Sequence, residues 1–180
     1  MRRTSAFAIT LAFVLMVLLY SQSPDDFLLS ASKAGRVEIG MTIDHVYAVH
    51  PRNQTRLTDL ALEGFFSPAL EIMDSGRSGS APSLTLEIGW NQNWVVSRIM
   101  VHDQRYKTDS GIGVGSLLGD VRRKYNVDWI DLGEGHLVAS VDSIGMGFLL
   151  DSQIISESWY QKRDKNLIPD SEKVIGVLIH

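Results

Sequence analysis

The feature that most constrains this chain is a pair of sequence patterns that each occur twice at nearly the same spacing. The segment VEIGMTIDHVYAVH (37–50) matches IGVGSLLGDVRRKY (112–125) at an offset of 75 residues, with a shared glycine and apolar residues at equivalent positions. The segment VVSRIMVH (95–102) matches KVIGVLIH (173–180) at an offset of 78 residues. A chance match of two turn-and-helix segments does not explain the second match, so the sequence predicts two tandem repeats.

The two predicted repeats share one internal order, the first over residues 35–102 and the second over residues 110–180. Each begins with an extended stretch, turns at Gly40 or Gly115, and enters a short helix. Three or four segments with the alternation of antiparallel strands follow each helix. A unit of about 70 residues buries little core alone, so we expect the two units to pack together in an α+β fold.

The stretch SGIGVGSLLGDVRRKY (110–125) resembles a nucleotide-binding loop, but its spacing does not fit one. In a dinucleotide fingerprint that begins at Gly113, the third glycine would fall at Leu118, and the preceding segment is polar rather than a core strand. Asp120 stands where a phosphate-binding loop needs lysine. We therefore predict that Gly40 and Gly115 are structural turns, with Thr42 and Ser116 as helix caps.

The N-terminal segment MRRTSAFAITLAFVLMVLLYSQS has two arginines, an apolar run and a polar exit, which is the layout of a secretory signal. We expect residues 1–21 to be a signal peptide or an uncleaved N-terminal anchor, and residues 22–34 to be a linker. Residues 103–109 are expected to connect the two repeats. The protein is then exported, periplasmic or extracellular, and contacts the inner membrane only through an uncleaved N-terminal segment.

Composition and residue spacing exclude several classes of function. The formal charge of −4 gives no basic footprint for nucleic acid, and the chain has no cysteine for a disulfide, a thiol nucleophile or a cysteine zinc site. The five histidines lack the spacing of paired helical metal ligands, although His102 and His180 occupy equivalent strand ends. Polar residues at strand ends explain that placement without a metal. We predict no catalytic residues, no metal site and no cofactor.

The candidate partner-binding residues are Trp159, Tyr160 and Arg163, in the long segment that precedes the last predicted strand. An exposed Trp-Tyr pair beside arginine is typical of residues that anchor a protein partner. The alternative, equally weighted, is that Trp159 folds back onto the sheet and closes the domain.

The stretch VHDQRYKTDSGIGVGSLLGDVRRKY and the C-terminal LIPDSEKVIGVLIH resemble the bacterial envelope-stress (sigma-E-regulated) lipoprotein family. The likeness covers about residue 95 to the end of the chain, and the chain lacks the lipidated cysteine of that family. The tandem architecture is also similar to beta-lactamase-inhibitor-like and outer-membrane assembly factor domains. These resemblances imply an exported module that binds other proteins and is not an enzyme.

The function expected from the sequence is non-catalytic binding of an envelope protein or polymer. A second hypothesis is a hydrolase that acts on an envelope polymer through a cleft between the repeats, which needs acidic or histidine groups from both repeats in one groove. A third is a structural envelope protein held by an uncleaved N-terminus.

Overall fold

The structure is a computed structural model that describes residues 24–62, 65–73, 81–89, 93–133, 135–151 and 157–180 of the 180-residue chain. The predicted signal peptide or anchor, residues 1–21, lies outside the described residues. Within the described ranges, no helix has the length and apolar content needed to cross a membrane.

The body of the protein is an eight-stranded sheet in which every pair of neighbouring strands is antiparallel. The strands lie in the order β4 (Thr55–Leu62), β5 (Phe65–Ile72), β6 (Leu84–Gly89), β7 (Val95–Val101), β12 (Val174–Ile179), β11 (Met146–Leu150), β10 (His136–Val141) and β9 (Trp129–Gly133). The predicted α+β class, with few helices and many antiparallel strands, is confirmed.

The helices are short and lie between groups of strands. They are α2 (Ile43–Val49), α3 (Leu118–Lys124) and α4 (Glu157–Lys162), with 3-10 turns η1 (Pro24–Phe27), η2 (Arg52–Gln54), η4 (Asp142–Ile144) and η5 (Lys165–Leu167). Thr42 caps α2, as predicted, and its hydroxyl accepts from the backbone N–H of His45. The prediction that Ser116 caps α3 is wrong. The N-cap is Leu117, whose N–H donates to the Asp120 carboxylate, while the Ser116 hydroxyl accepts from Gly113 N–H.

A second, smaller sheet contains the segments that we expected to be a linker and a connector. Its order is β3 (Val37–Glu38), β2 (Lys33–Ala34), β1 (Leu28–Ser30) and β8 (Lys107–Thr108), and β1 pairs with β8 in parallel. Leu29 and Ala34 are buried in the main core. The described part of the predicted linker is therefore part of the folded body, because it contributes core side chains and pairs with the connector.

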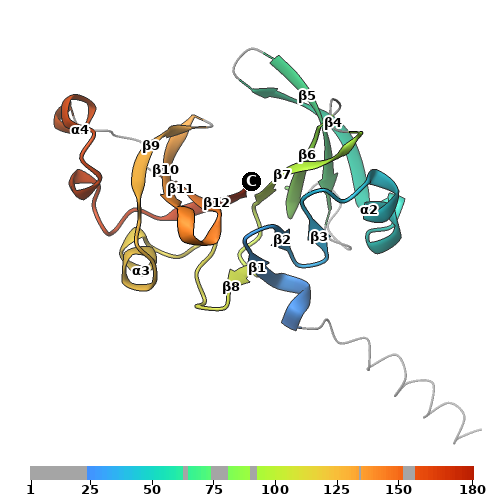
Figure 1. The fold of residues 1–180 in the computed structure, drawn as a ribbon, viewed down its shortest axis with the longest axis horizontal. Coiled ribbons are helices and arrows are strands. Elements are labelled where there is room, and N and C mark those ends of the chain that lie inside the picture. The colour runs from blue at the N-terminus through green and yellow to red at the C-terminus, as the bar shows by residue number, and fades with distance from the viewer. Residues whose placement is uncertain (1–23, 63–64, 74–80, 90–92, 134, 152–156) are drawn as a thin grey trace, which may run out of the picture.

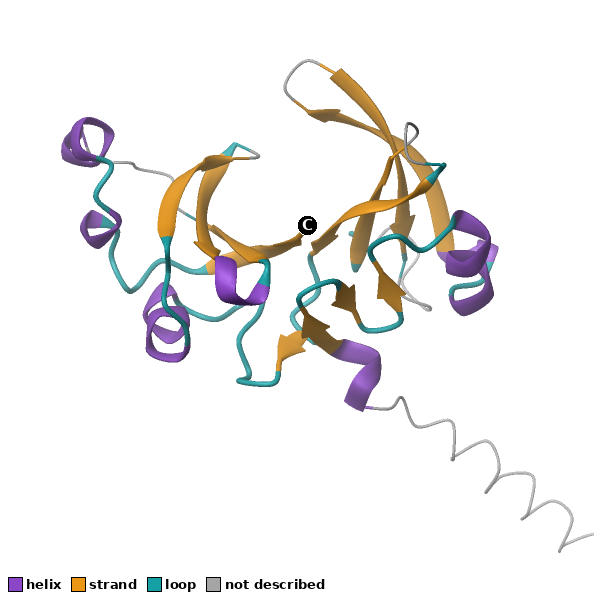
Figure 2. Ribbon diagram, viewed as in Figure 1, coloured by secondary structure: helices purple, strands orange, loops and turns teal. Residues whose placement is uncertain are grey.

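The eight-stranded sheet is strongly curved, and its two faces differ (Figures 1 and 2). The helices and the smaller sheet lie on its convex side, while the end of β12 lies near the middle of the curve. The main core fills the convex side, where Val46 of α2, Leu118 of α3 and Leu29 of β1 join alternate strand residues such as Leu86 and Phe148. The intervening strand residues point to the concave side, because successive side chains of a strand alternate between faces.

The two glycine turns before α2 and α3 have the backbone conformation that we predicted. Gly40 has φ 85° and Gly115 has φ 90°, which side chains with a β-carbon rarely adopt. The Gly40 N–H donates to the Val96 carbonyl, and the Gly115 N–H donates to the Val174 carbonyl, each at 2.8 Å. Each glycine therefore directs the chain from a strand position in the sheet into the following helix.

Candidate functional site

The glycine-rich stretch before α3 is bonded internally and offers no cradle for phosphate. The backbone N–H groups of Gly111, Gly113 and Gly115 donate to Thr108 O, Ser116 Oγ and Val174 O respectively. In the first turn of α3, Leu118 N–H and Gly119 N–H donate to Glu172 O and Asp170 O. Because these donors are already used, the loop serves as a turn and does not present N–H groups to a ligand.

The predicted aromatic anchor is only partly at the surface. Of the two alternatives for Trp159, the exposed one does not describe the structure, because its side chain is completely buried in the main core. Its ring meets that of Tyr160 edge-on at 5.5 Å, and the Arg163 guanidinium lies 4.7 Å from its ring centroid. Arg163 also forms an ion pair with Asp131 of β9. This arrangement attaches α4 to the edge strand, so the alternative that Trp159 folds back onto the body describes the structure.

The other two predicted anchor residues remain accessible. Tyr160 is 46% exposed and the Arg163 side chain is 49% exposed. A partner contact by Tyr160 and Arg163 therefore stays a prediction, without the contribution of Trp159.

The concave face of the large sheet contains one continuous row of side-chain positions across all eight strands. In this row each residue lies opposite the next one on the neighbouring strand. From β4 to β9 the residues are Arg56, Glu71, Thr85, Met100, Leu178, Gly147, Ser140 and Trp129. The half of this row on β4–β6 is charged or polar. The half on β12–β9 has small or apolar residues, with Trp129 48% exposed at the edge. The concave face is therefore polar at one side and apolar at the other.

A groove of about 260 Å³ lies on this face, across the junction of β7 and β12. We call it the concave groove, and it is lined by Leu60, Thr85, Glu87, Arg98, Met100, His102, His136, Leu149, Ile175 and Gly176. Its residues come from strands on both sides of the junction. The main core does not extend into it, because the core residues of the same strands point to the opposite face.

The apolar part of the concave groove is formed by a second hydrophobic cluster, separate from the main core. Val138, Leu149 and Leu178 are its buried members, and Met100 and Ile175 pack against them. A β-carbon built on Gly176 would have ordinary contacts, 3.6 Å from Leu149 Cδ2 and from Met100 Sδ. Gly176 is thus a position where a side chain would extend into the groove without a backbone clash.

The polar part of the concave groove consists of residues that are already paired with one another. Arg98 Nη2 lies 2.8 Å from Glu87 Oε2, with both side chains about three-quarters buried. Thr85 Oγ1 lies 2.9 Å from His102 Nε2. Loss of solvent around its imidazole lowers the pKa of His102, and the charge of Glu71 opposes that effect. Both hydrogen-bond donors and acceptors therefore lie beside the apolar part of the groove.

The acidic side chains of the concave face are paired with arginines. No group of three or more His, Asp or Glu side chains is placed to hold a metal ion in the part of the chain that the structure describes. Glu87 is engaged by Arg98, and Glu71 is engaged by Arg56 at 2.5 Å.

A cleft between the two predicted repeats was expected only for the hydrolase alternative, and the lining of the concave groove contains none of the predicted partner-binding residues. One signal for it was present: Thr85, Glu87 and Arg98 are polar residues at the outward positions of two strands, whereas Leu149 and Leu178 are apolar at such positions. The sequence does not show that these polar and apolar residues line one groove, because that depends on the pairing of β7 with β12.

Comparison with known proteins supports the fold and goes no further. No protein-family model matches the chain, and no curated protein sequence matches it. The crystal structure of the uncharacterized protein YfeY from Escherichia coli is similar, with a TM-score of 0.61 and 14% sequence identity. The match covers 85% of this chain and 99% of that one. At this identity, the likeness establishes that the two proteins share a fold.

Proposed function

We propose that this protein is a non-catalytic binding module of the cell envelope that takes up part of another protein in the concave groove. The observation that carries the proposal is the apolar floor of this groove, formed by Met100, Leu149 and Ile175 on a face that none of the described helices covers. Apolar side chains that gather in an open groove on a soluble body are typical of a binding surface.

The two sides of the groove specify the chemistry of the partner. A volume of about 260 Å³ accommodates one or two large apolar side chains, and the floor matches such groups. The Glu87–Arg98 pair and the Thr85–His102 pair offer both donors and acceptors beside that floor. The best fit is a protein loop that inserts a leucine, methionine or aromatic side chain and places its polar neighbours toward β6 and β7.

We further propose that the chain contains the two tandem repeats predicted from its sequence. Four strands follow α2 in the order β4–β7, and four follow α3 in the order β9–β12. The bonds from Gly40 to Val96 and from Gly115 to Val174 join positions that the offsets of 75 and 78 make equivalent. The reverse bonds, from Val96 N–H to Met41 O and from Val174 N–H to Ser116 O, are equivalent in the same way.

Export to the periplasm, or beyond it, is the location we propose, on the basis of the N-terminal sequence and of the resemblance to envelope-stress lipoproteins. Fractionation of cells and an intact mass of the mature protein test this proposal. Full-length protein that retains its N-terminal segment and is found in the cytoplasm would contradict this proposal.

The binding proposal is tested by photo-crosslinking in cells from His136, which lines the groove, and from Leu57, which is 67% exposed in the edge strand β4. We expect a discrete protein adduct from position 136 and none from position 57. Gly176→Leu, which fills the groove, should abolish the adduct, and urea unfolding of this variant establishes that it is folded. An adduct that survives Gly176→Leu, or no adduct from position 136, contradicts the proposed site.

One observation favours the second candidate function, hydrolysis in the same groove. The Thr85 hydroxyl lies 2.9 Å from His102 Nε2, which is the distance between a nucleophile and its general base. Incubation with a fluorescent fluorophosphonate separates the two functions. Labelling that is lost in both Thr85→Val and His102→Gln would favour the enzyme, and the binding proposal expects no labelling.

A further inference from the structure

A second cavity lies on the convex side of the sheet, away from the concave groove. It has a volume of about 130 Å³ and lies where η1, the β2–β3 turn and the end of α2 meet the ends of β5 and β7. Its polar lining comes from Asp26, Arg36, His50, Gln54, Ser83 and Arg105. A cavity of this size holds a ligand of about six non-hydrogen atoms, by comparison with apolar cavities that admit benzene.

His50 contributes a polar atom to this region that has no partner. The residue is 8% exposed, and its Nε2 atom is buried without a hydrogen bond to any described residue. Its backbone N–H caps α2 by donating to the Val46 carbonyl at 2.8 Å, which fixes the position of the residue. A buried imidazole nitrogen without a partner is uncommon in folded proteins and requires an explanation, such as a water molecule or a bound ion.

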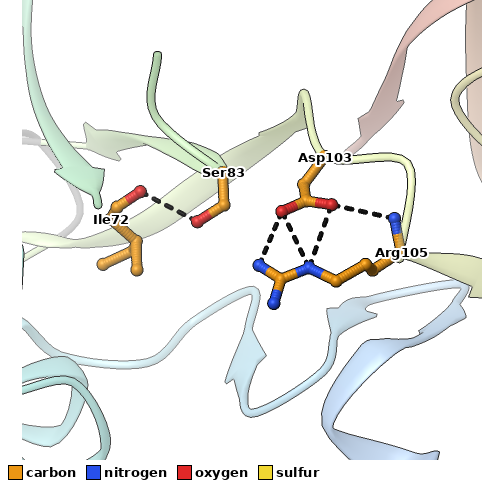
Figure 3. A network of polar contacts seen from close by, with 4 residues as sticks. All are labelled: Ile72, Ser83, Asp103 and Arg105. Carbon is orange, nitrogen blue, oxygen red and sulfur yellow. Dashed lines mark hydrogen bonds and ion pairs between the residues drawn. The ribbon is translucent and has the colours of Figure 1, made fainter. Parts of the chain in front are cut away.

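Two guanidinium groups border the cavity, each near a carboxylate. Arg36 and Arg105 are two positive side chains in the lining, and Asp26 is its one negative side chain. Arg105 is held by bonds to the Asp103 carboxylate, as Figure 3 shows, and its guanidinium stacks 4.5 Å from the Phe27 ring centroid. Arg36 is half exposed, and its Nε atom lies 3.4 Å from the Asp26 carboxylate, a long separation for an ion pair.

Burial and the charge of Arg36 lower the pKa of His50 to about 4, so the imidazole is neutral near pH 7. A neutral imidazole in the tautomer with hydrogen on Nε2 can donate one bond to an anion. A guanidinium supplies two parallel donors to the oxygens of a carboxylate.

We propose that this cavity binds a small carboxylate, with Arg36 and His50 Nε2 as its donors. Asp26 and Asp103 balance the charges of Arg36 and Arg105, so a monoanion adds one negative charge to this region, whereas a phosphate dianion adds two. Gln54 provides polar surface for the rest of such a molecule, and the Ser83 hydroxyl, which donates to the Ile72 carbonyl at 3.0 Å (Figure 3), can still accept a hydrogen bond. This site is independent of the concave groove and does not require the proposed protein-binding function.

The test is NMR of the isotope-labelled full chain titrated with sodium acetate at pH 7, with sodium chloride at equal ionic strength as the reference. We expect a saturable shift of the His50 imidazole signals with acetate and a rise of the His50 pKa by about one unit at saturation, because a bound anion offsets the charge of Arg36. A cavity that holds water alone gives no difference between acetate and chloride, and that result overturns the proposal.

Two variants assign the donors. Arg36→Gln is expected to weaken acetate binding at least tenfold. Arg52→Gln is the matched control, because Arg52 stacks on the Tyr47 ring near the same helix and does not line the cavity. If both variants lose acetate affinity equally, acetate responds only to the overall positive charge of this region, and the proposed site is overturned. Saturation by sodium phosphate without saturation by acetate overturns the carboxylate assignment.

Discussion

Met100 of β7 and Leu178 of β12 lie directly opposite each other at the centre of the eight-stranded sheet. The two residues occupy the same position in the two proposed repeats, which differ by 78 residues at this point. Only three residue pairs in register join β7 to β12, and Met100–Leu178 is the middle one. Both side chains belong to the hydrophobic cluster of the concave face, so this pair connects the halves of the sheet to the floor of the groove.

The junction between β7 and β12 is expected to be sensitive to truncation of Leu178. Leu178→Ala should lower the free energy of unfolding by about 2–3 kcal/mol, because the side chain is buried in a well-packed cluster. Leu57→Ala, in the same sheet but 67% exposed, should change it by less than about 0.5 kcal/mol. Urea denaturation measures both. Equal effects in the two variants would show that the concave cluster does not contribute to stability.

The two glycine turns are expected to respond alike to substitution. Gly40→Ala and Gly115→Ala should each cost about 1–2 kcal/mol of stability, because alanine is strained at φ values of 85° and 90°. The added methyl groups meet no neighbouring atom within 4 Å, so the cost comes from the backbone. Thermal unfolding of both variants is the measurement. A large loss for one glycine with none for the other would contradict the equivalence of the turns.

His50 is expected to make stability depend on pH. Its pKa is about 4 in the folded protein and about 6.5 in an unfolded chain, so the unfolded state binds the proton first as the pH falls. The stability present above pH 6.5 should decline by about 3 kcal/mol as the pH falls to 4, and level off below that. Urea denaturation across this range, with His50→Gln as the reference, isolates the effect. An unchanged slope in His50→Gln would assign the pH dependence to other groups.

Trp159 and Tyr160 are neighbours in α4 that are expected to differ sharply. Trp159→Ala should destabilise the protein by about 3–5 kcal/mol, since it removes a fully buried ring. Tyr160→Ala should stay within about 1 kcal/mol, since Tyr160 is 46% exposed. Trp159→Phe, which retains most of the apolar volume, should lie between them. A mild effect of Trp159→Ala in urea denaturation would mean that α4 detaches without disturbing the core.

Several elements of the fold followed from local sequence. The helix starts near residues 42 and 117 and the occurrence of antiparallel strands after each helix were predicted from glycine, capping and alternation signals. Strand β5 has Pro68 in its middle, which weakens the strand signal of this segment. In the structure, β5 pairs with β6 only from Ala69 onward. Pro68 therefore has β4 as its only neighbouring strand, and the N–H that proline lacks removes no hydrogen bond to β6.

The candidate sites depended on longer-range information. The exposure of Trp159 was undecided in the sequence because the surrounding segment could either project or fold back. The Arg163–Asp131 ion pair and the Lys165–Asp128 hydrogen bond, which attach the segment to the start of β9, join residues more than 30 positions apart. The lining of the second cavity likewise comes from residues between 26 and 106, and no local pattern marks them as a group.

The sequence by itself determined the glycine turns, the starts of α2 and α3, the alternation of strand residues and the recurrence of two patterns at offsets of 75 and 78, because each of these features depends on residues that are close along the chain. The pairing of β7 with β12, and with it the concave groove, was decided only by tertiary structure. Strand register across such a distance is selected by which apolar faces can be buried together, and that depends on the whole fold.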